Sequence, residues 1–68
     1  MKMLAIVTDK SGKVLGKTYT KNIPDAVQWA MDTNQTDTFS LFLFNGHENK
    51  PIRHYEFSSL WSCVERSA

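Results

Sequence analysis

The residues that could bind a metal through nitrogen or sulfur are His47, His54 and Cys63. None of them stands in a C-x-x-C or H-x-x-x-H spacing. A structural zinc site needs four ligands, which these three residues cannot supply. The sequence therefore predicts no metal site.

Nucleophilic catalysis would need Cys63 or a serine beside a base and a group that orients the base. His54 could approach Cys63, but a cysteine with apolar neighbours is more often a small packing residue. The glycines (Gly12, Gly16 and Gly46) are dispersed, and no glycine-rich loop precedes a helix to hold a phosphate. We therefore expect no enzymatic activity and no cofactor.

Basic and aromatic residues alternate along two predicted strands. Because side chains on a strand repeat every second residue, such residues share a face and could hold single-stranded nucleic acid. They are Lys13, Lys17, Tyr19, Lys21, Arg53 and Tyr55. Lysine also suits the edge of a sheet, where it discourages aggregation. Nucleic-acid binding is an alternative hypothesis rather than the first one, because a net charge of +1 is low for that function.

Trp29 suggests a protein partner instead. In the predicted helix over 22–32, the apolar residues follow the i, i+3, i+4, i+7, i+8 spacing of one core-facing stripe. They are Ile23, Ala26, Val27, Ala30 and Met31. An α-helix turns by about 100° per residue. Trp29 therefore lies more than about 90° around the helix axis from the centre of this stripe, on the side of Asp25 and Asp32.

Trp29, Asp25, Gln28 and Asp32 therefore form a candidate partner-binding surface, since tryptophan is enriched at the energetic centres of interfaces. The other interpretation is that Trp29 folds over the flank of the helix. It would then cover other large side chains, because tryptophan is mostly buried in small domains. The candidates for such cover are Tyr19, Leu60 and Trp61.

A small set of elements must position these side chains. Apolar and β-branched residues predict strands over 2–8, 13–21, 38–44 and 52–57. Asn22, Pro24 and Asp25 suit the start of the helix as its cap, its first turn and its positive end. A short helical turn is predicted over 60–66, with Leu60, Trp61 and Val64 on one face and Ser58 or Ser59 as its cap.

The order ββαββ predicts an α+β two-layer sandwich, in which one helix lies across a four-stranded antiparallel sheet. In the strand over 38–44, large apolar residues occupy both faces, which predicts a central strand with at least partial cover on both sides. One face carries Phe39, Leu41 and Leu43, and the other carries Phe42 and Phe44.

Length and composition allow one domain over 1–68, with the hydrophobic fraction of 41% that is typical of a folded chain. A single cysteine excludes an intrachain disulfide, and no apolar run approaches the ~20 residues needed to span a membrane. Residues 1–4 lead into a strand rather than a signal peptide. We expect a cytoplasmic protein with no membrane partner.

The charges are unevenly distributed: residues 1–21 carry +4, residues 22–49 carry −4 and residues 50–68 carry +1. This pattern predicts a basic end and an acidic end, which would steer encounter with a charged partner. Ordinary solubilising surface charge is the other interpretation.

The stretch DAVQWA resembles the D-x-V-Q-W-A run of the Dmd family of phage antitoxins, and the order of elements around it is also similar. The matching residues are Asp25, Val27, Gln28, Trp29 and Ala30. The resemblance implies a phage-encoded inhibitor that occupies the groove of a host ribonuclease toxin. It leaves Trp29, Asp25 and Gln28 as contact candidates, because Val27 and Ala30 belong to the core stripe.

We therefore expect a non-enzymatic binding protein of phage or mobile-element type. It would block a host defence enzyme, a toxin ribonuclease or a CRISPR-type nuclease, by occluding its groove. Trp29 would be the anchor, and Asp25 and Asp32 would face a basic nucleic-acid groove. The alternatives are nucleic-acid binding by the lysine-bearing sheet face and formation of a homodimer through exposed edge strands.

Overall fold

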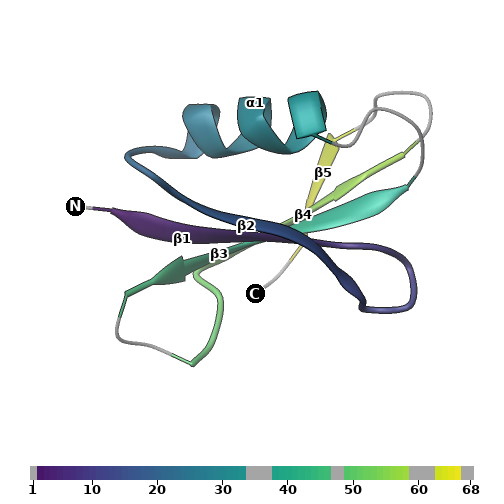
Figure 1. The fold of residues 1–68 in the computed structure, drawn as a ribbon, viewed down its shortest axis with the longest axis horizontal. Helices are drawn as coiled ribbons and strands as arrows, with labels where there is room; N and C mark the ends of the chain where they lie inside the picture. Colours follow the sequence, from purple (N-terminus) through teal and green to yellow (C-terminus); the bar gives the residue numbers. More distant parts are fainter. Residues whose placement is uncertain (1, 34–37, 47–48, 59–62, 67–68) are drawn as a thin grey trace.

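A computed structural model describes residues 2–33, 38–46, 49–58 and 63–66. The elements are β1 (Met3–Thr8), β2 (Val14–Thr20), α1 (Ile23–Thr33), β3 (Phe39–Asn45), β4 (Arg53–Phe57) and β5 (Cys63–Arg66). The strands form one antiparallel sheet in the order β2-β1-β3-β4-β5. The helix α1 lies across one face of this sheet (Figure 1). The α+β class with two layers is confirmed, but the sheet has five strands rather than four.

The turn between β1 and β2 is organised by the carboxylate of Asp9. Its Oδ1 accepts hydrogen bonds from the backbone N–H of Ser11 (2.9 Å), the Ser11 hydroxyl (2.7 Å) and the backbone N–H of Lys13 (3.0 Å). Gly12 adopts a φ of 91°, a left-handed conformation that glycine takes without steric strain. The turn predicted for the stretch DKSG is therefore present, and its hydrogen bonds join residues that are close in the sequence.

The turn makes hairpin stability sensitive to acid. The hydrogen bond from the Ser11 hydroxyl, followed by the backbone N–H of Lys13, lowers the pKa of Asp9 below its ordinary value. Since the pKa is lower in the folded than in the unfolded chain, this stabilisation is present above the unfolded pKa and is lost as the pH falls through the folded one. We expect urea unfolding at pH 7 and at about pH 3 to show a smaller loss of stability in Asp9→Asn than in the parent. Equal losses in the two proteins would contradict this role.

The helix begins as predicted. The side-chain Oδ1 of Asn22 accepts a hydrogen bond from the backbone N–H of Asp25 at 2.9 Å, which caps the first turn. The predicted apolar stripe faces the sheet: Ala26 and Ala30 are fully buried, and the rest of the stripe packs against the core. The two alanines let the helix approach the sheet closely, because neither has a side chain beyond Cβ.

The core lies between α1 and the sheet face that it covers. The interior strands are β1, β3 and β4, and every second residue of β1 and β3 is buried there. The core residues are Ala5, Val7, Ala26, Ala30, Phe39, Leu41, Leu43 and Phe57. Phe39 and Phe57 stack across β3 and β4 with their ring centroids 4.6 Å apart. The predicted central position of β3, with Phe39, Leu41 and Leu43 on the core side, is confirmed.

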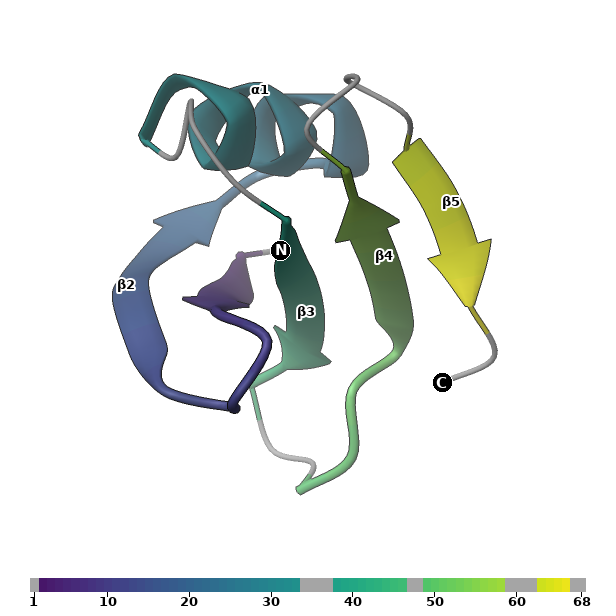
Figure 2. The same cartoon turned by 90° about the vertical axis from the view of Figure 1, so that its right-hand side faces the viewer.

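The opposite face of the sheet is covered by none of the described helices and strands, since α1 lies on the other side and all the strands belong to the sheet (Figure 2). Phe42 and Phe44 point to this face and are half-buried. The ring of Phe42 stacks on that of His54 of β4 on this face. No helix among the described residues is both long and apolar enough to cross a membrane.

The prediction of a C-terminal helical turn is wrong for residues 63–66. They form β5, an antiparallel strand in which Cys63 pairs with Phe57 and Arg66 with His54. Leu60, Trp61 and Ser59 lie outside the described residues, and Ser58 is not helical. A short segment of this kind fits a helical or an extended pattern equally well. Pairing with β4 provides hydrogen-bond partners for its backbone N–H and C=O groups. Two cross-strand ion pairs accompany that pairing: Arg53–Glu65 (3.6 Å) and Arg66–Glu56 (3.4 Å).

Candidate binding surfaces

The first candidate surface is the acidic helix face, formed by Asp25, Gln28, Trp29 and Asp32 of α1. Spacings of three, four and seven residues place these four side chains within one sector of the helix. Asp25, Gln28 and Asp32 are exposed, and the Gln28 Nε2 donates a hydrogen bond to the Asp32 Oδ1 at 2.9 Å. This hydrogen bond orients one of the two carboxylates. The face therefore presents two separated negative charges on a rigid element.

Trp29 lies at the border between this face and the sheet. It is half-buried and packs against the core. Its six-membered ring covers Gly16 of β2: a Cβ built on that glycine would lie 3.6 Å from the indole Cζ2. The ring thus seals the flank of the helix against the edge strand and keeps part of its surface accessible. This cover falls on Gly16, not on Tyr19, whose position along β2 faces the other side of the sheet.

The position of Trp29 depends on three small residues that the sequence pattern did not connect with it. The helix sits close to the sheet on Ala26 and Ala30, so a long side chain on its flank reaches down to the edge strand. Gly16 provides the space for the ring, because it has no side chain on the face that α1 covers.

The second candidate surface is the open sheet face, the side of the sheet turned away from α1. Its residues follow from the strand register, in which Leu4 pairs with both Tyr19 and Phe44, and Phe42 with His54. The face includes Leu4, Ile6, Lys17, Tyr19, Phe42, Phe44, His54, Glu56, Val64 and Arg66. Tyr19 is the most exposed large apolar residue among those described, at 66%.

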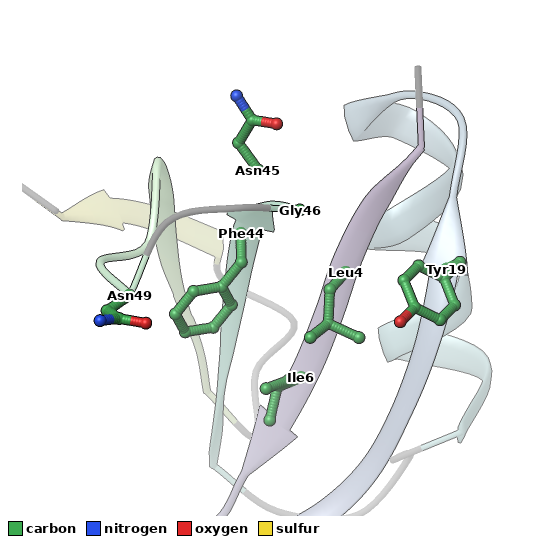
Figure 3. A pocket seen from close by; sticks show the side chains of 7 residues that line it. All are labelled: Leu4, Ile6, Tyr19, Phe44, Asn45, Gly46 and Asn49. Atoms are coloured by element: carbon green, nitrogen blue, oxygen red, sulfur yellow. The ribbon is translucent and has the colours of Figure 1, made fainter.

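A hollow of about 270 Å³ opens on this face. Leu4 and Ile6 of β1 form its floor, and Tyr19 of β2 and Phe44 of β3 stand on either side (Figure 3). Its remaining lining residues are Asn45, Gly46 and Asn49, from the end of β3 and the loop that follows. Next to the hollow, the rings of Phe42 and His54 stack with centroids 4.2 Å apart. The hollow is therefore a shallow site with aromatic side chains on two sides and the Asn49 amide beside Phe44 (Figure 3).

The sequence predicted only part of this second surface. Lys17 and Tyr19 lie on it, while Arg53 and Tyr55 are in register with Leu43 and Leu41 and so belong to the face that α1 covers. Arg53 is ion-paired with Glu65 there, and Tyr55 packs against the core. Lys13 lies in the turn before β2, and Lys21 immediately follows that strand.

The residues that complete the surface, Leu4, Ile6, Phe42, Phe44 and His54, were not identified as site residues. The sequence of β1 and β3 does indicate a second apolar face, because apolar residues occupy both sides of each strand. Predicting the open sheet face also requires the strand order, which places β1 between the strands of Tyr19 and Phe44.

Of the residues considered for metal binding or nucleophilic catalysis, Cys63 and His54 are not partners in the described sheet. Cys63 is registered with Phe57, three residues along β4 from His54, and His47 lies outside the described residues. His54 stacks on Phe42, and its Nε2 is buried without a hydrogen-bond partner among the described atoms. Within the described ranges, no three His, Cys, Asp or Glu side chains are grouped as a metal site would require.

Comparison with protein-family models, with curated proteins and with solved structures gives no significant match. The chain is a small α+β domain with two chemically different surfaces on opposite sides. Its function is therefore argued from the chemistry of those surfaces.

Proposed function

We propose that this chain is a non-enzymatic binding protein that inhibits a nuclease by laying its acidic helix face in the enzyme's nucleic-acid groove. The observation that carries the proposal is the exposure of Asp25 and Asp32 on one side of α1, with Trp29 beside them. Seven residues separate the two carboxylates, which is about 10.5 Å along a helix axis. Two fixed negative charges at that distance complement a groove whose cations bind phosphates.

The charge distribution supports the same partner. Residues 22–49 contain four acidic residues and no lysine or arginine, so the stretch that carries the helix is acidic as a whole. The half-buried indole of Trp29 adds apolar contact area next to the charges, as in interfaces where a central aromatic residue is surrounded by polar groups. The resemblance of residues 25–30 to the Dmd antitoxins favours a ribonuclease toxin as the target, with a CRISPR-type nuclease as a further candidate. Both targets imply that the protein works in the cytoplasm of a host cell.

The test uses the tagged chain to capture a partner from a bacterial lysate, followed by assay of the captured protein's nuclease activity with and without the chain. We expect Asp25→Lys/Asp32→Lys to lower affinity by about tenfold or more, because both rim charges are reversed. The matched control Lys10→Glu/Lys50→Glu also reverses two exposed charges, but away from α1, and should retain capture and inhibition. A captured protein whose nuclease activity is unaffected, or equal capture by the helix variant, would contradict the proposal.

Trp29→Ala supplies an independent measurement of the same surface. Removing the indole should weaken the complex by about 2 kcal/mol, or about thirtyfold in the dissociation constant. Because Trp29 also packs on Gly16, circular dichroism must first establish that the variant is folded. A folded Trp29→Ala protein that binds and inhibits like the parent would exclude Trp29 as an anchor.

A further inference from the structure

The open sheet face is not used by the proposed inhibitor, because it lies on the side of the sheet opposite α1. It nevertheless carries the most exposed aromatic ring of the described chain, that of Tyr19, and a hollow between two rings. Its half-buried apolar side chains form a surface of the kind that binds ligands or partners. The chemistry of the hollow and of its borders identifies the occupant.

We propose that the open sheet face binds single-stranded nucleic acid, with one base in the hollow between Tyr19 and Phe44. A base is a flat ring with polar edges, and proteins that bind single strands stack such rings on aromatic side chains of a sheet. The hollow offers the aliphatic side chains of Leu4 and Ile6 as a floor and aromatic side chains on two sides (Figure 3). Its volume of about 270 Å³ accommodates one base rather than a folded partner.

A polar group for the edge of the base is present beside Phe44. Asn49 lines the hollow there, and its amide supplies both hydrogen-bond donors and acceptors, whereas the Asn45 side chain points away from the hollow (Figure 3). The stacked pair of Phe42 and His54 lies beside Phe44 on the same face. This pair gives a neighbouring base a second surface on which to stack. A strand crossing from β2 to β4 would thus meet ring surfaces along its path.

The charges along this path complement a phosphate backbone. Lys17 lies on the face, and Lys2 and Lys21 are exposed at the end where Met3 pairs with Thr20, next to the hollow. Glu56 is the only carboxylate on the face among the described strand residues, and it lies 3.4 Å from Arg66 in an ion pair. The net charge of the face and its border is therefore positive, in contrast to the acidic helix face.

A second copy of this chain fits the face less well than a nucleic acid does. Face-to-face pairing would bring the raised ring of Tyr19 and the charged groups of both copies into a dry interface, where unpaired charges are unfavourable. A hollow needs an object that projects into it, and an isolated base stacked between rings is such an object. Phosphates remain in water at the lysine edge of β2.

The test measures binding of fluorescent oligouridine, oligothymidine and a DNA duplex by anisotropy at about 50 mM salt, where electrostatic contacts are strong. We expect both single strands to bind more tightly than the duplex, and the ratio of RNA to DNA affinity will identify the preferred strand. Tyr19→Ala should weaken single-strand binding by about tenfold, whereas Tyr19→Phe, which keeps the ring, should stay close to the parent. Tyr19 is exposed, so neither substitution is expected to unfold the chain.

Charge variants distinguish binding at the open sheet face from non-specific electrostatic attraction. Lys17→Glu should weaken binding and reduce its salt dependence, while Lys10→Glu, the same change in the distant β1–β2 turn, should have a smaller effect. In a protein that carries Asp25→Lys/Asp32→Lys, Tyr19→Ala should still weaken single-strand binding. This test of nucleic-acid binding is therefore independent of the proposed inhibitor function. Absence of binding, equal binding of duplex, equal effects of the two lysine variants, or a Tyr19-dependent dimer in sedimentation would overturn the proposal.

Discussion

Leu43→Ala is expected to remove about 3 kcal/mol from the free energy of unfolding, the central value for a leucine that loses its buried side chain. Leu43 is fully buried between the sheet and the rest of the core. A chain of 68 residues has a total stability of roughly 3–10 kcal/mol. The variant should therefore be marginal or partly unfolded at room temperature, because a core formed on one face of one sheet has little reserve.

Leu4→Ala is the matched control, since it removes the same atoms from the other face of an interior strand. Leu4 is only half-buried on the open sheet face, so its loss should lower stability by about 1 kcal/mol. Urea denaturation followed by circular dichroism measures both variants against the parent. If the two leucines proved equally important, the second face would be covered in solution by something that the monomer does not contain.

The helix was predictable from the sequence because its signals are local. Asn22 and Pro24 specify where it begins, and the spacing of the apolar stripe specifies the face that it buries. The hairpin turn is similarly local, since Asp9 bonds to residues two, three and four positions along the chain. Interactions within a few residues leave a pattern that can be read without knowledge of the fold.

The C-terminal strand could not be predicted for the opposite reason. Cys63–Arg66 is short, and its conformation depends on the edge of β4, with which it pairs. The ion pairs of Arg53 with Glu65 and of Arg66 with Glu56 join residues ten or more positions apart. A four-residue segment is too short for its periodicity to distinguish helix from strand, so pairing with β4 determines its conformation.

The same distinction applies to the candidate sites. The acidic helix face comes from one element, and the structure brings Asp25, Gln28 and Asp32 together as the helical spacing requires. The open sheet face draws residues from every strand, so it exists only through the order β2-β1-β3-β4-β5. Tyr19 and Phe44 are distant in sequence, yet Leu4 pairs with both.

Ala30→Asp is expected to have the other large effect on stability. Ala30 is fully buried where α1 meets the sheet, and none of the residues in the described core cluster carries a charge. An unpaired carboxylate at this position should lower stability by about 3–5 kcal/mol at neutral pH, which is enough to release the helix or unfold the chain. Because that helix carries Asp25 and Asp32, such a variant should also lose nuclease inhibition.

The pH dependence of this variant distinguishes a buried charge from a general packing defect. Burial disfavours the ionised form and raises the pKa of the introduced carboxyl above its unfolded value, so protonation relieves the destabilisation as the pH falls. The difference in stability between Ala30→Asp and the parent should therefore shrink between pH 7 and about pH 5. Thr33→Asp, at the exposed end of the same helix, should change stability by about 1 kcal/mol or less. A deficit in Ala30→Asp that stayed constant across this pH range would mean that α1 is not held against the sheet at Ala30.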